Sequence, residues 1–266
     1  MPLTLDALKI DVDKVSKKII NGIKEYMANV GINRAVVGVS GGVDSATTLT
    51  LAVRALGPEN ITALIMPDPM ATPEEDIEDA RSLAKMLGVK VEYVEIGDIF
   101  NTYAKSMPFF NPNAVKANGN LKARIRMCLL YYYANVNNAL VIGSGDKSEI
   151  LIGYFTKYGD GGVDLLPIGD LYKTQVRQLA IGLGVPKKIA YKPSSPRLWP
   201  GHMAEDELGL SYEEIDIILY AYHDLGLSED EIVQRCNISA DKVKRVISMV
   251  RNSEHKRKMP PIIRIK

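Results

Sequence analysis

Two spacings of apolar residues divide the first hundred residues into alternating elements. Short apolar, β-branched runs predict three buried strands, at residues 35–39, 61–66 and 89–96. Apolar side chains at every third or fourth position predict three helices, one before the first strand, at residues 11–29, and two between the strands, at 43–56 and 73–88. Because helices join successive strands, the strands form a parallel sheet with right-handed crossovers. The expected fold class is α/β, a Rossmann-like parallel sheet flanked by helices.

The second half of the chain adds one strand and more helices. Further elements are predicted as helices at residues 121–138 and 171–183, a strand at 139–142, and loops at 111–120 and 191–210. In the first of these helices, Ile125, Cys128, Leu129 and Tyr132 are expected to point inward. The capping boxes Ser211-x-x-Glu214 and Ser228-x-x-Glu231 open C-terminal helices. Since no repeat or linker interrupts the pattern, residues 1–266 are expected to form a single domain.

Composition removes several classes of function. The 266 residues are 46% apolar and 24% charged, with a net charge of +1, which gives no reason to expect nucleic acid or an anionic membrane as partner. Two distant cysteines and three scattered histidines indicate neither a disulfide framework nor a zinc site. No apolar run reaches the length of a membrane span, and the N-terminus has no signal pattern. The chain is expected to be cytoplasmic.

The first predicted strand is followed directly by a glycine-containing polar stretch, Ser40-Gly-Gly-Val-Asp-Ser45, at the start of a helix. Adjacent glycines allow close approach of a ligand, and the first N–H groups of a helix attract phosphate. Ser40 and Ser45 add hydroxyl donors, and Asp44 adds a carboxylate that suits a divalent cation. An ordinary capped turn is the alternative. Because no lysine follows the glycines, the stretch is not a P-loop.

Longer stretches carry a family resemblance. The Ser40–Ser45 stretch resembles the pyrophosphate loop of N-type ATP pyrophosphatases, which have the adenine nucleotide alpha hydrolase-like fold and cut ATP between its α- and β-phosphates. Four later stretches follow one another as in NAD synthetases, at residues 120–127, 143–149, 153–164 and 171–177. The Pro193-Ser-Ser and His255-Lys-Arg sequences continue the match. The chain is therefore identified as a member of this family, in a form similar to the ammonia-dependent enzymes.

The resemblance assigns roles to individual residues. Contacts to ATP are implied for Gly38, Val39, Ser40, Gly41, Gly42, Val43, Asp44, Ser45, Ser144, Lys173 and Ser194. Contacts to deamido-NAD are implied for Arg124, Lys157, Asp164, His255 and Lys256. Magnesium is implied at Asp44 and Glu149. Asp44 and Lys173 are expected to be catalytic, and Asp160 is a separate hypothesis, as the base that takes a proton from ammonium. Met203-Ala204 departs from the Thr-Asp of many relatives.

Several of these residues have plainer explanations. Glu149 can cap the helix that follows the fourth strand, and Arg124 can be a solvated charge on a helix face, with Arg126 pointing elsewhere. The basic run 254–258 can be a frayed end. Lys173 opposes the dipole at the start of its predicted helix, so an anionic ligand would explain its placement.

The resemblance implies a reaction in two steps and a set of partners. ATP and Mg²⁺ would convert the nicotinate carboxylate of deamido-NAD into an acyl-adenylate, and ammonia would then displace AMP to give NAD. A homodimer is expected from the family. One alternative is another adenylating ATP pyrophosphatase, either GMP synthetase-like or tRNA-modifying. A remote alternative is a DNA-binding protein, because residues 230–245 have a helix–turn–helix pattern.

Overall fold

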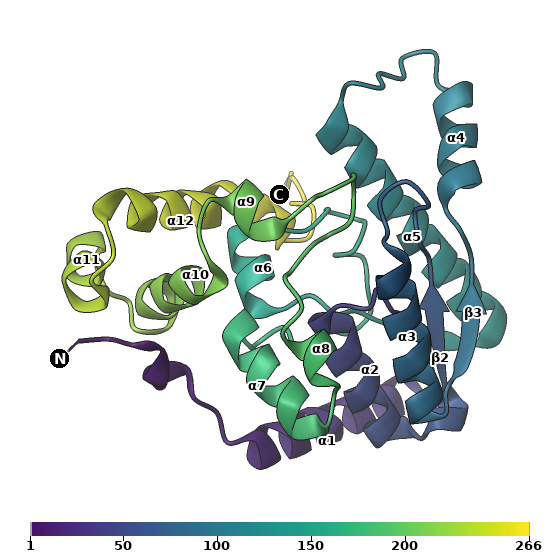
Figure 1. Ribbon diagram of the computed structural model, residues 1–266, viewed down its shortest axis with the longest axis horizontal. Helices are drawn as coiled ribbons and strands as arrows, with labels where there is room; N and C mark the ends of the chain where they lie inside the picture. Colours follow the sequence, from purple (N-terminus) through teal and green to yellow (C-terminus); the bar gives the residue numbers. More distant parts are fainter. Residues whose placement is uncertain (1, 266) are drawn as a thin grey trace.

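The computed structural model describes residues 2–265 and contains one parallel sheet (Figure 1). Its strands lie in the order β3-β2-β1-β4, with bounds Arg34–Gly38 for β1, Ile61–Ile65 for β2, Lys90–Tyr93 for β3 and Ala139–Ile142 for β4. Val37 of the central strand β1 is paired with Ala63 on one side and Ile142 on the other. The predicted α/β class with a parallel sheet is confirmed.

Side chains of the strands alternate between two helical layers. Val37 and Ile142 belong to the hydrophobic cluster shared with α1 (Val12–Val30), α2 (Val43–Leu56), α3 (Glu74–Leu87) and α7 (Lys173–Leu183). Val36 and Val141 point the other way, into the cluster shared with α5 (Val115–Asn137), against which α4 (Gly97–Ser106) packs. This alternation buries both faces, as expected for a parallel sheet between helices.

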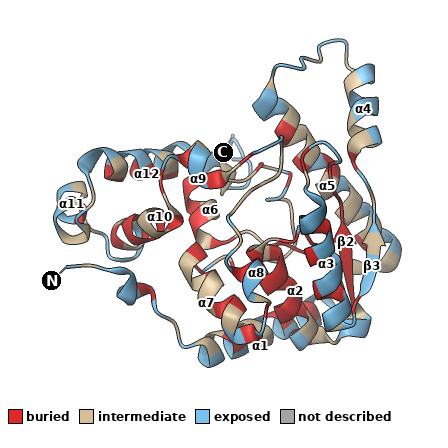
Figure 2. Cartoon of the chain, viewed as in Figure 1, coloured by how far each residue is buried: buried red, intermediate tan, exposed pale blue. Residues whose placement is uncertain are grey.

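The C-terminal part builds a second hydrophobic core beside the sheet (Figure 2). It consists of α6 (Lys147–Ile152), α9 (Ala204–Leu208), α10 (Tyr212–Leu219), α11 (Glu229–Cys236) and α12 (Ala240–Asn252). Short elements are η1 (Leu5–Leu8), η2 (Pro58–Asn60), α8 (Lys187–Ala190), η3 (Tyr220–Asp224) and η4 (Glu254–Lys256). Both predicted capping boxes are present, at Ser211 and Ser228. The helix pair of the 230–245 pattern thus contributes to a core.

The structure differs from the expected elements around α5. The helix begins at Val115, so half of the predicted 111–120 loop is helical, and α4 was not predicted. Ile125 is buried as expected, but Cys128 and Tyr132 are exposed. The reason is that α5 packs only one face on β1 and β4, and the stripe containing Cys128 and Tyr132 lies on the opposite face. None of the helices between residues 2 and 265 has the length and apolarity needed to cross a membrane.

A buried carboxylate joins the second core to the carboxyl edge of the sheet. Asp216 of α10 accepts hydrogen bonds from Ser148 Oγ at 2.5 Å and from the Thr174 N–H at 2.7 Å, which lie on α6 and α7. Burial raises the pKa of Asp216 to about 7, although both hydrogen bonds oppose the change. The folded protein therefore holds this proton at a pH where the unfolded chain has lost it.

This difference predicts a dependence of stability on pH. A raised acid pKa contributes stability that is complete below the unfolded value near 4 and is lost as the pH rises through about 7. We expect the free energy of unfolding of Asp216→Asn, relative to the unsubstituted chain, to increase by roughly 2–3 kcal/mol between pH 5 and pH 8. Urea unfolding of both proteins at pH 5 and pH 8 measures how the difference between their free energies of unfolding changes with pH. No change between the two pH values would contradict the prediction.

Candidate active site

A tight loop between β1 and α2 presents backbone N–H groups at the carboxyl edge of the sheet. Gly41 has φ of +79°, and an added Cβ would lie 2.2 Å from the carbonyl oxygen of Asp76. Ser45 Oγ accepts a hydrogen bond from the Ser40 N–H at 3.2 Å and lies 3.1 Å from Ser40 Oγ. Gly42 precedes α2 without a side chain to cap the helix. The loop is therefore preshaped, with uncapped donors at a helix N-terminus, as anion sites require.

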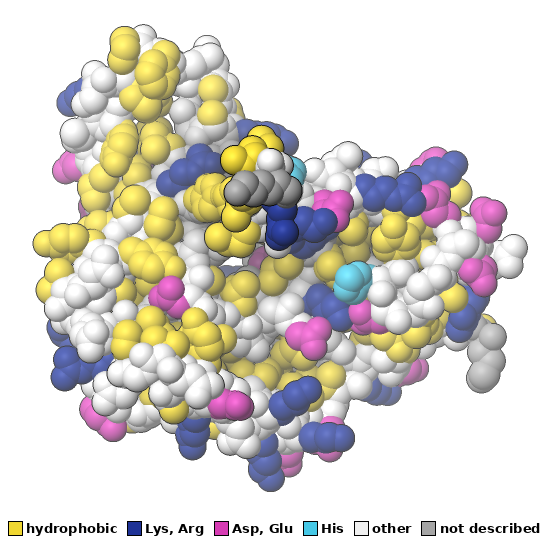
Figure 3. All heavy atoms as spheres, turned by 180° about the vertical axis from the view of Figure 1, so that it is seen from behind, with side chains coloured by type: hydrophobic (Ala, Val, Ile, Leu, Met, Phe, Trp, Pro, Cys, Tyr) yellow, Lys and Arg dark blue, Asp and Glu magenta, His cyan; other side chains and the backbone are white. Residues whose placement is uncertain are grey.

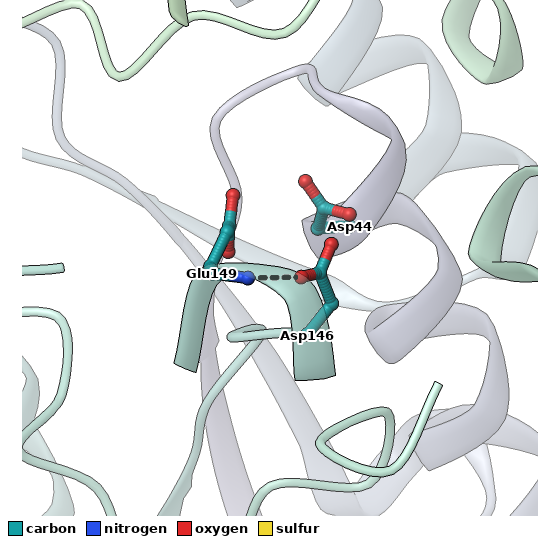
Figure 4. Close-up of side chains that lie close together, drawn as sticks. All are labelled: Asp44, Asp146 and Glu149. Carbon is teal, nitrogen blue, oxygen red and sulfur yellow. Dashed lines mark hydrogen bonds between the residues drawn. The ribbon is translucent and has the colours of Figure 1, made fainter. Parts of the chain in front are cut away.

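Three carboxylates surround one buried ammonium next to this loop. Lys173 Nζ lies 2.6 Å from Asp44 Oδ2, 2.8 Å from Asp146 Oδ2 and 2.9 Å from Glu149 Oε1. Asp44 comes from the start of α2, and the other two acids come from the start of α6, where Asp146 accepts the Glu149 N–H as a helix cap (Figure 4). Lys173 is thus paired with three carboxylates of the protein itself, where its place in the sequence indicated an anionic ligand.

Burial sets the electrostatics of this cluster. It raises the pKa of Glu149 well above its ordinary value and also raises that of Asp146, while the charge of Lys173 partly opposes both shifts. Burial alone would lower the pKa of Lys173, but the neighbouring acids outweigh it and leave the value well above normal. The cluster thus places three acidic groups and one ammonium beside the loop at residues 40–45.

A cavity of about 530 Å³ extends from this edge toward α5 and the C-terminal part. Ten of the predicted site residues line it, namely Gly38, Val39, Ser40, Asp44, Ser45, Ser144, Glu149, Asp160, Ser194 and Lys256. Asp160 is exposed, and its carboxylate accepts the Thr156 N–H at 2.8 Å. Desolvation by the surrounding protein raises the pKa of Asp160. Gly42 and Val43 line a smaller neighbouring pocket, and Lys173 lies behind the acids.

The residues expected to contact the dinucleotide form a second group. Lys157 Nζ donates to the His255 carbonyl at 2.8 Å, and Arg124 Nη2 donates to the Lys157 carbonyl at 3.2 Å. Lys256 Nζ donates to the carbonyls of Gly153 and Phe155, at 2.8 and 2.9 Å. The C-terminal turn is therefore fastened to residues 153–157. Asp164 is not part of this attachment. Its carboxylate accepts hydrogen bonds from Tyr131 Oη and from the Val141 N–H in β4.

Comparisons with known proteins agree on one family. The family model described as NAD synthase matches residues 15–260. The chain belongs to this family. It is 55% identical to the NH(3)-dependent NAD(+) synthetase of Hyperthermus butylicus, over 98% of this chain and 94% of the relative. It is 48% identical to the enzyme of the same name from Archaeoglobus fulgidus, over 97% of this chain and 99% of the relative.

Solved structures of the family have the same fold. An NH3-dependent NAD synthetase from Campylobacter jejuni, in complex with the nitrate ion, gives a TM-score of 0.81 at 34% identity, over 96% of this chain and 100% of that one. An NMN synthetase from Francisella tularensis gives a TM-score of 0.83 at 34% identity, over 96% of this chain and 99% of that one. The predicted family and fold are therefore confirmed.

Sequence reasoning missed several NAD synthase residues at the site. Asp146 was assigned only to a loop, although the Asp-x-x-Glu spacing before a helix is a capping signal that also sets two carboxylates side by side. Arg126 lies two positions from Arg124, on the other face of α5, where it lines the cavity and donates to the Met66 carbonyl at 2.9 Å. His202 and Glu207 meet Tyr154 through long-range contacts that no local pattern encodes.

The two glycines of the loop give a matched test of its shape. Gly41→Ala forces a Cβ against a backbone carbonyl at a left-handed φ, so we expect the protein to lose at least about 2 kcal/mol of stability. Gly42→Ala should cost less than about 1 kcal/mol, because its Cβ would meet only Ser40 Oγ at 3.4 Å. Urea unfolding compares the two variants. Equal losses would show that the loop relaxes freely.

Proposed function

We propose that this chain is an ammonia-dependent NAD synthetase, which converts deamido-NAD, ATP and ammonia into NAD, AMP and pyrophosphate. One observation carries the proposal: the loop at residues 40–45, two of the clustered acids and Asp160 line the same cavity in a member of the NAD synthase family. The Hyperthermus and Archaeoglobus relatives bear this activity in their names, and the chain covers nearly their whole length.

The first step activates the nicotinate carboxylate. One of its oxygens attacks the α-phosphorus of ATP, forming an acyl-adenylate as the bond to the β-phosphate breaks. Negative charge builds on the departing pyrophosphate, and the N–H groups of residues 40–45 stabilise it at the N-terminus of α2. Ser144 and Ser194 line the cavity and add hydroxyls to the nucleotide site. The main task is to hold two anionic substrates together.

Asp44, Asp146 and Glu149 would hold the magnesium ion that the family implies. One oxygen from each lies within 4.8 Å of the others, and hard carboxylate oxygens are the ligands Mg²⁺ prefers. Asp44 Oδ1 is buried and has no hydrogen-bond partner among residues 2–265, which leaves it available as a ligand. When bound, the ion neutralises charge on the phosphates. Lys173 holds the three carboxylates together and keeps a positive charge beside them.

The second step makes the amide. Ammonia attacks the acyl carbon, a C–N bond forms, AMP leaves with its phosphate oxygen, and one proton must be removed from the nitrogen. Asp160 is the proposed base, because it lines the cavity and its raised pKa makes it a better proton acceptor. Arg124, Lys157, Asp164, His255 and Lys256 are proposed to position the dinucleotide. Residues 1–266 would act as one catalytic domain, in the cytoplasm.

The decisive experiment incubates the purified chain with ATP, Mg²⁺, ammonium and deamido-NAD. We expect NAD, AMP and pyrophosphate in equal amounts. Nicotinate mononucleotide replaces deamido-NAD in a parallel reaction, because one structural relative is named an NMN synthetase. ADP and orthophosphate would exclude the proposal, and preferential amidation of the mononucleotide would change the substrate.

A lysine substitution tests the cluster within the same assay. Lys173→Met leaves three carboxylates without their central cation, so pyrophosphate release should fall by at least about 100-fold. Lys147→Met is the matched control, since this lysine of the same region pairs with Asp224 and Asp170 instead. Similar losses in both variants would argue for a general structural effect.

We also propose a homodimer formed through α5. Cys128, Tyr132 and Val136 follow one another at helical spacing on its exposed face, and the exposed fractions of the last two are 73% and 67%. From behind, hydrophobic side chains gather over α4 and α5 (Figure 3). Such a stripe is typical of an interface between copies.

A charge placed in this stripe tests the dimer. Val136→Glu should convert the protein from dimer to monomer in sedimentation velocity, because an unpaired carboxylate would be buried between the copies. Met86→Glu, at an exposed apolar residue of α3 on the other side of the sheet, should remain dimeric. A monomeric unsubstituted chain would refute the assignment directly.

A further inference from the structure

An ionic cluster joins the segment after α8 to the first half of α3. Lys192 Nζ lies 2.7 Å from Asp76 Oδ1 and 2.6 Å from Asp79 Oδ2, and Arg197 Nε lies 2.7 Å from Asp76 Oδ2. Lys188 forms a further pair with Asp79. Three cations thus share two carboxylates, and the cluster keeps a surplus of one positive charge. Burial lowers the pKa of Lys192, but its two acids more than compensate, so it stays charged.

This cluster lies against the phosphate loop. A small pocket of about 50 Å³ is lined by Ser40 and Gly42 of the loop and by Lys192, Ser194 and Arg197 of the later segment. Asp76 also lines it, and its backbone carbonyl is the atom that leaves no room for a side chain at position 41 of the loop. The two cations therefore face the uncapped N-terminus of α2.

Several polar groups around this pocket lack acceptors. Ser194 Oγ is buried and has no hydrogen-bond partner within residues 2–265. Within the same residues, the Arg197 side chain donates one hydrogen bond, from Nε to Asp76 Oδ2. The four N–H groups on its two Nη atoms are therefore available. Arg197 also has φ of +50°, a conformation that costs a non-glycine residue free energy and recurs at ligand sites. Donors from two separate segments thus converge on one place.

We propose that Lys192 and Arg197 bind the two terminal phosphates of ATP, and hence the pyrophosphate that leaves, in competition with the Asp76 carboxylate. The inference rests on the proposed function, because it concerns the leaving group of that reaction. A phosphate offers Arg197 the same pair of oxygens as a carboxylate, with more charge. The backbone donors of the loop and the two cations then hold the pyrophosphate from opposite sides.

The competition makes this proposal distinguishable from a structural clamp. If Asp76 competes with phosphate, removal of its charge frees both cations and tightens the binding of pyrophosphate. If the ion pairs only fasten the 192–197 segment to α3, the same substitution loosens the segment and weakens binding. The two explanations therefore predict opposite signs for Asp76→Asn.

Titration calorimetry with inorganic pyrophosphate and MgCl₂ measures this without turnover. We expect Arg197→Gln and Lys192→Gln each to raise the Kd at least about 10-fold, since each removes a charge-assisted contact. Asp76→Asn should lower the Kd at least about 3-fold. Lys188→Gln is the matched control, because Lys188 pairs with Asp79 but does not line the pocket, and its Kd should stay within about 2-fold. Arg197→Lys, which keeps the charge, should recover part of the affinity.

Thermal unfolding of each variant establishes that it is folded. An unchanged Kd in both cation variants, or a raised Kd in Asp76→Asn, would overturn the inference. These results are independent of the amidation assay. A chain that makes NAD while its cation variants bind pyrophosphate normally refutes only the inference, whereas the expected Kd changes without NAD formation would refute only the proposed function.

Discussion

The site depends on one ammonium group held among three carboxylates. Lys173 is fully buried at the start of α7, and its partners come from the starts of α2 and α6. An uncompensated charge at this depth would be very unfavourable, so the three helices can pack together only with the cluster intact. The ion pairs of Lys173 that fix the starts of these helices also hold three carboxylates beside the loop at residues 40–45. The same side chains therefore stabilise the packing of the helices and form the candidate site.

The parallel sheet brings these groups to a common edge. Because Val36 and Val37 face opposite layers, β1 is buried on both sides and can be polar only where it ends. The loops after β1 and β4 therefore carry the polar residues, and adjacent strands set them side by side. The second core adds the remaining wall of the cavity, and Asp216 links it to α6 and α7.

Local patterns in the sequence predicted much of this arrangement. The Ser40–Ser45 loop, the parallel sheet and the two capping boxes follow from spacing within a few residues, and all are present. Local spacing did not predict which face of α5 is buried, since that depends on where β1 and β4 lie. Nor did it predict that Lys192 and Arg197 meet Asp76, more than a hundred residues earlier in the chain. Long-range ion pairs leave no periodic signal.

The attachment of the C-terminal turn has a consequence for the wall of the cavity. Lys256 donates to the carbonyls of Gly153 and Phe155, and Arg257 donates to that of Leu151 at 2.6 Å. Gly153 packs so closely on Ser253 that an added Cβ would lie 2.1 Å from the serine Cβ. Residues 153–156 line the cavity, so this part of its wall is held by contacts from a segment about a hundred residues later in the chain.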